Sequence, residues 1–193
     1  MKVAWTVLLG TILFASWVLG ADCAGVQNAA ASQLIAYLKS SAINAEPECV
    51  TVAIRRLGDL RDASGTSALI SALDFARPKS VKEEAGLSDL HDRYPAVPAL
   101  FSIGPNAAPA LVNAIASGQL NDIATKNAIR AVSLIYRDTP PDSIKIFQKA
   151  AQASNDPRSR KRLKVAAETA AKLCISSWRE RCEQQLSSLS LQR

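Results

Sequence analysis

The chain has 193 residues and a net charge of +6, and 48% of its residues are hydrophobic although only 5% are aromatic. This length is enough for one domain with its own apolar core. No segment alternates apolar and polar residues over the length of a strand, which excludes a fold built mainly from sheet. Abundant alanine suits helices that pack closely.

The first twenty residues have the pattern of a secretory signal peptide. Met1-Lys2 gives a short positive start, an apolar run covers Val3–Leu19, and Gly20-Ala21 offers small residues for cleavage. We predict cleavage near Gly20-Ala21, a secreted or periplasmic location, and a single domain over residues 21–193 without a membrane span. The alternative is an uncleaved N-terminal anchor, because the run approaches the roughly 17–25 residues that cross a bilayer.

The rest of the chain is predicted to be all-α, with about eight or nine helices. Apolar residues recur at helical spacing, and hydroxyl residues and prolines mark helix starts. Gly58 is expected to end one helix in a left-handed cap, and Gly118 another. Residues 77–93 form a charged insertion. A short helix, Val81–His91, is expected in this insertion. The other expected helices are Gln27–Ser40, Cys49–Leu57, Ser67–Phe75, Pro95–Ile103, Ala107–Ala116, Leu120–Tyr136, Asp142–Ala153, Arg158–Cys174 and Trp178–Leu189.

The sequence pattern of a helical hairpin occurs twice, in Ala53–Leu73 and Ala96–Ile115. Each copy has an apolar helix ending in Leu-Gly or Ile-Gly, a polar turn, and a second helix ending in Ala-Leu or Ala-Ile. A single such pair cannot bury its apolar face, whereas stacked pairs can. The second helices of the pairs (Ser67–Phe75, Ala107–Ala116 and Asp142–Ala153) are expected to line a concave face that is poor in charge.

The residues in these hairpins resemble a known repeat. The segments YPAVPAL (residues 94–100) and IGPNAAPAL (residues 103–111) are similar to HEAT-like repeats of the short bacterial type, a class also found in phycobilisome lyases. The resemblance covers Cys49–Leu73 and Asp92–Ile115. It implies a short α-solenoid of stacked antiparallel helix pairs and, commonly, protein–protein binding. It does not imply lyase activity, because no chromophore motif is present.

The four cysteines are an even set in a chain with an export signal, which favours disulfides over free thiols. Three connectivities are possible, and we prefer Cys23–Cys49 with Cys174–Cys182 because each bridge would staple one end of the array. An unbroken helix would separate the last two cysteines by about 12 Å, whereas a bridge needs Cα atoms about 4.4–6.8 Å apart. We therefore predict a helix break, with a new helix starting at Ser177.

Basic residues are concentrated near the C-terminus. Residues 156–193 carry nine Lys/Arg and four Asp/Glu, whereas the two signs balance over residues 21–155. Basic residues in the first turns of a helix oppose its macrodipole by about 0.3–1 kcal/mol each, so they are not there for helix stability. One interpretation is a patch for an anionic partner, and the other is a solvated helix face whose stems cover apolar neighbours. The patch comprises Arg158, Arg160, Lys161, Arg162 and Lys164.

The residues point to binding rather than catalysis. His91 is the only histidine and there is no CxxC motif, which argues against zinc, and no nucleophile elbow is present. We predict an exported protein-binding scaffold or adaptor with no cofactor and no enzymatic activity. We expect its partner to be a protein, which could be acidic, or an anionic component of the cell envelope. Nucleic acid is disfavoured because the patch lacks aromatic stacking positions. The alternative is an accessory subunit or enzyme of the cell envelope with a site near residues 77–93.

Overall fold

The computed structural model describes residues 23–40, 46–79 and 93–190, and only the backbone of residues 175–190. Within these ranges the chain is helical and contains no strand, which confirms the prediction of an all-α chain for this part of the sequence. Eight α-helices of six or more residues are present there, together with the four-residue helix α1. The predicted signal peptide, the helix Val81–His91 and His91 itself lie outside the described residues.

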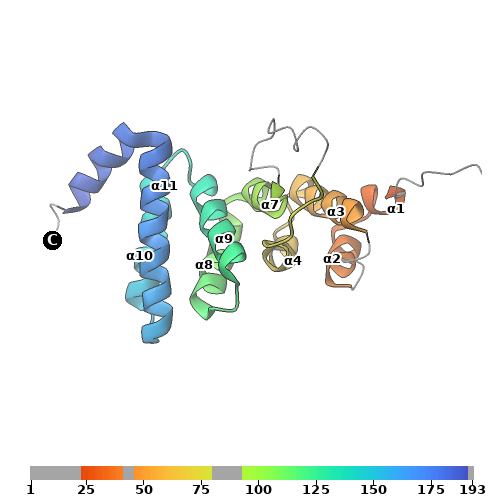
Figure 1. The fold of residues 1–193 in the computed structure, drawn as a ribbon, viewed down its shortest axis with the longest axis horizontal. Helices are drawn as coiled ribbons and strands as arrows, with labels where there is room; N and C mark the ends of the chain where they lie inside the picture. Colours follow the sequence, from red (N-terminus) through yellow and green to blue (C-terminus); the bar gives the residue numbers. More distant parts are fainter. Residues whose placement is uncertain (1–22, 41–45, 80–92, 191–193) are drawn as a thin grey trace, which may run out of the picture.

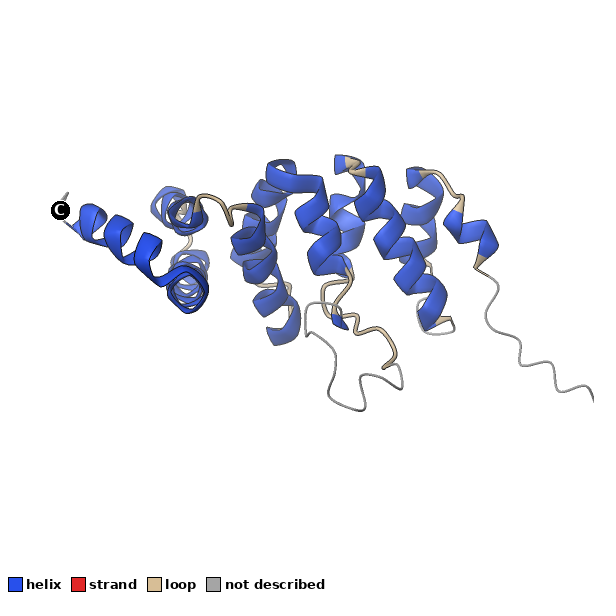
Figure 2. Ribbon diagram, turned by 90° about the horizontal axis from the view of Figure 1, so that it is seen from above, coloured by secondary structure: helices blue, strands red, loops and turns tan. Residues whose placement is uncertain are grey.

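The helices follow one another along the long axis of the molecule, from α1 at one end to α11 at the other (Figure 1). Their axes also change direction along the row. The helices from α2 to α7 are seen nearly end-on in Figure 1 and from the side in Figure 2, whereas α10 and α11 show the reverse. The helices are α1 (Ala24–Gln27), α2 (Ala31–Lys39), α3 (Pro47–Leu60), α4 (Thr66–Ser71), α7 (Ala96–Ile103), α8 (Ala108–Ser117), α9 (Asp122–Ile135), α10 (Pro140–Ala153) and α11 (Pro157–Ser190), with 3₁₀ turns at Ala63–Gly65 and Gly104–Ala107.

The helices form two layers. In one layer α3 packs on α7 and α7 on α9; in the other, α2, α4, α8 and α11 follow one another. The contacts of α2 with α3, of α4 with α7 and of α8 with α9 join the layers. Leucines and small alanines fill the space between them, and alanine lets helices approach closely. The largest fully buried side chains include Leu34, Ile54, Leu57, Leu69, Leu73, Leu100, Leu111, Ile144, Phe147 and Leu163.

The last helix pair differs from the prediction. We expected α10 to pair with α9 and to continue the face formed by α4 and α8. Instead α10 packs mainly on α11, and it is α11 that lies beside α8. Only residues 154–156 separate α10 from α11, and such a short connection favours antiparallel neighbours. α11 has a buried stripe that includes Leu163, Ala166 and Ala170.

Gly58 does not end a helix, contrary to the prediction. It lies inside α3, and α3 ends at Leu60 with Arg61 in the left-handed conformation (φ 51°). A Cβ added at Gly58 would stand 2.7 Å from the Cα atom of Ala99 in α7. This glycine is therefore needed where two helices cross, not where one ends. The prediction for Gly118 is confirmed, because it closes α8 at φ 72°.

The predicted helix Gln27–Ser40 starts too early: the short α1 ends at Gln27, and α2 begins at Ala31 after residues 28–30. Helix α2 begins where the side-chain oxygen of Gln33 accepts a hydrogen bond from the backbone N–H of Ala30, at 3.0 Å. The two ends of the charged insertion lie side by side, because the backbone N–H of Arg77 donates to the carbonyl oxygen of Arg93 at 3.0 Å.

The structure contains the predicted disulfide between Cys23 and Cys49, with their Cα atoms 5.3 Å apart. The bridge ties the start of α1 to the first turn of α3. Cys174 is also disulfide-bonded, while the side chain of its predicted partner, Cys182, lies outside the described residues. The predicted new helix at Ser177 is not separate: α11 is one helix over Pro157–Ser190, but its ribbon bends sharply in the C-terminal part (Figure 1). A kinked helix can change direction without ending.

Candidate binding surface on helix α11

The start of α11 is fixed by Asp156, which caps the helix. Its carboxylate accepts hydrogen bonds from the backbone N–H groups of Arg158 (3.1 Å) and Ser159 (3.0 Å), and the Ser159 hydroxyl lies 2.6 Å away. These bonds, with those from Ser159 the strongest, hold the pKa of Asp156 below its usual value, and the nearby Arg162 guanidinium adds to the effect. The cap places a negative charge beside the crowded basic residues, where the positive end of the helix dipole favours it.

Arg162, one of the five predicted patch residues, has a structural role. Its Nε atom donates to the carbonyl oxygen of Ala116 at 3.0 Å, its Nη2 atom donates to the same oxygen, and the Ser159 hydroxyl lies 2.8 Å from it. The guanidinium covers Gly118, where an added Cβ would stand 2.7 Å from Cζ of Arg162. This arrangement ties the end of α8 to α11, so most of the hydrogen-bonding capacity of Arg162 is used inside the molecule.

The other four patch residues are exposed to solvent. Arg160 donates to the carbonyl oxygen of Ser154 at 2.9 Å, in the turn before α11, and keeps its remaining donors available. The side chains of Arg158, Lys161 and Lys164 make no ion pair with any residue in the part of the chain that the structure describes. Among the described residues, three exposed basic side chains thus form no ion pair and a fourth is only partly engaged.

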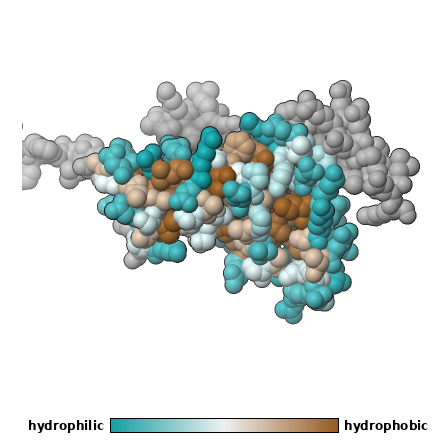
Figure 3. All heavy atoms as spheres, turned by 180° about the vertical axis from the view of Figure 1, so that it is seen from behind, coloured by the Kyte–Doolittle hydropathy of each residue, from teal (hydrophilic) through white to brown (hydrophobic). Residues whose placement is uncertain are grey.

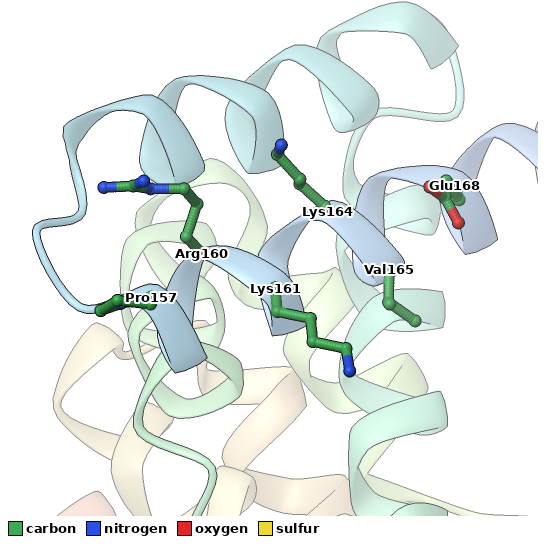
Figure 4. Close-up of a pocket in the computed structure, with 6 residues that line it drawn as sticks. All are labelled: Pro157, Arg160, Lys161, Lys164, Val165 and Glu168. Atoms are coloured by element: carbon green, nitrogen blue, oxygen red, sulfur yellow. The ribbon is translucent and has the colours of Figure 1, made fainter.

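A shallow depression of about 370 Å³ lies along α11 among these residues (Figure 4). In Figure 4, Arg160 and Lys164 extend toward the α10 side of the helix, whereas Lys161 and Val165 extend to the other side. Glu168 is the one acidic residue in the lining. The depression is lined by Pro157, Arg160, Lys161, Lys164, Val165 and Glu168.

A second depression, of about 200 Å³, adjoins the first because Lys161 and Val165 line both. It lies where α8, α9 and α11 meet, and its lining is mainly apolar. We call the two depressions together the α11 surface. The residues that line the second one are Ile115, Thr125, Ile129, Lys161, Arg162, Val165 and Ala166.

Sequence analysis did not identify the apolar residues of this surface. Val165 is the clearest omission: it lies outside the stripe formed by Leu163, Ala166 and Ala170, and it is 51% exposed. A helical projection of this segment places an isolated valine beside Lys161, four residues away, and could have revealed it. Ile115 and Ile129 could not be found in this way, because the sequence does not say that the ends of α8 and α9 meet α11.

Figure 3 shows the face opposite to that of Figure 1. In the space-filling view of Figure 3, apolar side chains form separate spots among hydrophilic ones.

Across the described residues, no three His, Cys, Asp or Glu side chains are grouped so that they could hold a metal ion. His91, the residue on which the alternative of an enzyme depends, is outside these residues.

The segment Ala96–Ser117 is apolar enough and, at 22 residues, long enough to cross a membrane if it were one helix. In the structure it is not one helix but α7 and α8, with Gly104 at φ 81° in the turn between them. Helices of 8 and 10 residues are too short to span a bilayer, which takes about 20 residues. Leu100 and Leu111 are fully buried in the core, which accounts for the apolar composition.

Comparison with protein-family models, with curated proteins and with solved structures finds no match. The resemblance of the two hairpins to HEAT-like repeats therefore stays a prediction from the residues themselves.

Proposed function

We propose that this chain is an exported binding module, built as a short α-solenoid of the HEAT type, that holds a partner protein and performs no catalysis. The two-layer packing supports the solenoid: α3, α7 and α9 follow one another in one layer, and α4, α8 and α11 in the other. The hairpin repeated in Ala53–Leu73 and Ala96–Ile115 falls on α3–α4 and α7–α8. The gradual turn of the helix axes in Figures 1 and 2 is typical of stacked helical repeats.

The α11 surface is the observation that carries the proposed binding role. It combines an apolar depression at the meeting point of three helices with exposed Lys161 and Lys164 on its rim. Interfaces in proteins commonly place an apolar contact inside a polar rim. The face that we propose for binding therefore differs from the one expected from the sequence, because α11 rather than α10 continues the layer of α4 and α8.

The disulfide between Cys23 and Cys49 supports export. Disulfides persist in oxidising compartments and are rare in the cytosol. Together with the signal-peptide pattern of the first twenty residues, the bridge favours a periplasmic or secreted location for the module.

Site-specific photo-cross-linking tests the proposed function. A benzoylphenylalanine replaces Val165 in the full chain, produced in the cells that make it, and a matched chain carries the same group in place of Lys149. Lys149 is exposed on α10 and lines neither depression. We expect a discrete protein adduct from position 165 and little from position 149, with unchanged helix content by circular dichroism. Absence of a protein adduct from every exposed position tried would contradict a binding module.

A further inference from the structure

We infer that the α11 surface takes a segment of the partner protein in which an acidic residue lies within one helical turn of a bulky apolar residue. The apolar side chain would occupy the depression between α8, α9 and α11, and the carboxylate would lie against Lys161, while Lys164 on the α10 side of the helix adds to the positive field. This inference rests on the proposed function and specifies the chemistry of the partner.

The charges of the α11 surface indicate the sign of the partner's charge. Around the two depressions the basic residues are Arg160, Lys161, Arg162 and Lys164, and the acidic residue is Glu168. Glu168 makes no ion pair within 4.0 Å with a described residue, and Asp156 is held by the cap of α11. The net positive field favours an acidic partner and speeds its association.

The geometry of the α11 surface indicates how far apart the acidic and the apolar residue of the partner lie. Lys161 lines both depressions and extends to the same side of α11 as Val165, toward the apolar lining (Figure 4). The charged and apolar contacts are therefore within one turn of α11 of each other. A partner that uses both contacts must present its acid and its apolar side chain close together, as residues three or four apart on a helix do.

The shape favours a polypeptide over a lipid surface. A recess of about 200 Å³ among Ile115, Ile129 and Val165 suits one protruding side chain, and a flat layer of head groups offers none. The recess is also preformed, because the hydrogen bonds from Arg162 to the Ala116 carbonyl hold α11 against α8. Such preorganisation reduces the cost of binding.

The cross-linking experiment at position 165 tests this inference when it is repeated in charge variants. Lys161→Gln combined with Lys164→Gln removes two positive charges from the rim, and Lys149→Gln removes a single charge elsewhere. We expect the yield of the protein adduct to fall about two- to fivefold in the double variant, as the loss of one exposed ion pair allows. In the wild type the yield should rise toward a plateau as salt is lowered, and in the double variant this dependence on salt should be lost. Lys149→Gln should leave the yield unchanged.

Mapping the adduct by mass spectrometry gives the decisive result. We expect the cross-linked segment of the partner to carry Asp or Glu within four residues of an apolar residue. A segment without an acid, or a yield insensitive to both rim charges, overturns the inference while the binding module stands. A lipid adduct at position 165 also overturns it, in favour of a membrane surface. No adduct at position 165 but one at another exposed position places the partner elsewhere and overturns the inference alone.

Discussion

Gly58 lies where α3 crosses α7, and the crossing leaves no room for a side chain. An added Cβ would stand 2.7 Å from Cα and 2.9 Å from Cβ of Ala99, so the backbone of α7 would have to move. In an open helix the exchange of glycine for alanine is favourable by about 1 kcal/mol. At Gly58 the steric cost exceeds this gain.

We therefore predict that Gly58→Ala lowers the free energy of unfolding by about 1–3 kcal/mol, the usual cost of overpacking a filled core. Urea denaturation followed by circular dichroism measures it. Gly25→Ala is the matched control, because Gly25 lies in α1 with nothing within 4 Å of the added atom, and we expect no loss there. A Gly58→Ala protein as stable as the wild type would show that the two helices do not cross at this point.

Asp156 makes the stability of the α11 cap depend on pH. Because its pKa in the folded protein lies below the ordinary value of 3.8, its carboxylate contributes fully to stability above that pH, and the contribution is lost as the pH falls through the folded-state pKa. We predict that Ser159→Ala, which removes the strongest hydrogen bond to the carboxylate, raises the pKa of Asp156.

Titration of the Asp156 carboxyl by nuclear magnetic resonance checks this prediction. Arg158→Ala serves as the control, since the bond from residue 158 comes from its backbone N–H and survives the substitution. The stability difference between the wild type and Ser159→Ala should be largest at neutral pH and should shrink below pH 3.8. If the pKa of Asp156 is the same in both proteins, the Ser159 hydroxyl does not contribute to the cap.

At the scale of elements, the second helix of each repeated hairpin is tied at its end by a side chain from a later helix. The Leu73 carbonyl, just after α4, accepts a hydrogen bond from the buried Asn127 of α9 at 2.7 Å. The Ala116 carbonyl in α8 accepts its bonds from Arg162 of α11. In both cases a polar group that helix geometry leaves unpaired is satisfied across the interface between neighbouring pairs.

We predict that Asn127→Ala lowers the free energy of unfolding by about 1–3 kcal/mol, because it leaves the Leu73 carbonyl without its partner. Arg162→Ala should cost less, since Arg162 is partly exposed and water can reach the Ala116 carbonyl after the change. Lys161→Ala, one residue away on the same helix, should stay within about 0.5 kcal/mol of the wild type. Equal stability of Asn127→Ala and Lys161→Ala in urea denaturation would contradict the tie.

Helix bounds that depend on local signals could be predicted from the sequence, whereas contacts between residues distant in the sequence could not. The bounds of α7, α8 and α10 follow from local signals, such as the prolines at their first turns and the glycine at position 118. Gly58 was misread because a glycine that permits a close approach and one that ends a helix look alike in a sequence. Arg162 was assigned to a binding patch because no local pattern names the carbonyl that it reaches, 46 residues away.

The candidate site was predictable in its charge and not in its shape. Lys161 and Lys164 could be identified from the run of basic residues, and both are exposed as a binding patch requires. The depression beside them depends on which helix follows α8, and periodicity alone does not distinguish α10 from α11. That choice depends on long-range packing, in which α10 packs mainly on α11 across the short turn at 154–156.

At the scale of the whole molecule, the helix pairs lie in a row and not around a common centre (Figures 1 and 2). Each layer is made by neighbours along the chain, so the core is long and narrow and the ends of the row are tied only to adjacent helices. The Cys23–Cys49 bridge closes the end formed by α1 and α3. This architecture gives a small domain more surface for a partner than a compact domain of equal length.

Small-angle X-ray scattering of a chain without residues 1–20 measures this arrangement most directly. A compact domain of this length has a radius of gyration of about 16 Å. A row of stacked helix pairs predicts a clearly larger radius and a distance distribution that peaks early and falls in a long tail. A symmetric distribution with a radius near that of the compact domain would contradict a row of pairs, and with it the extended surface on which the proposed binding depends.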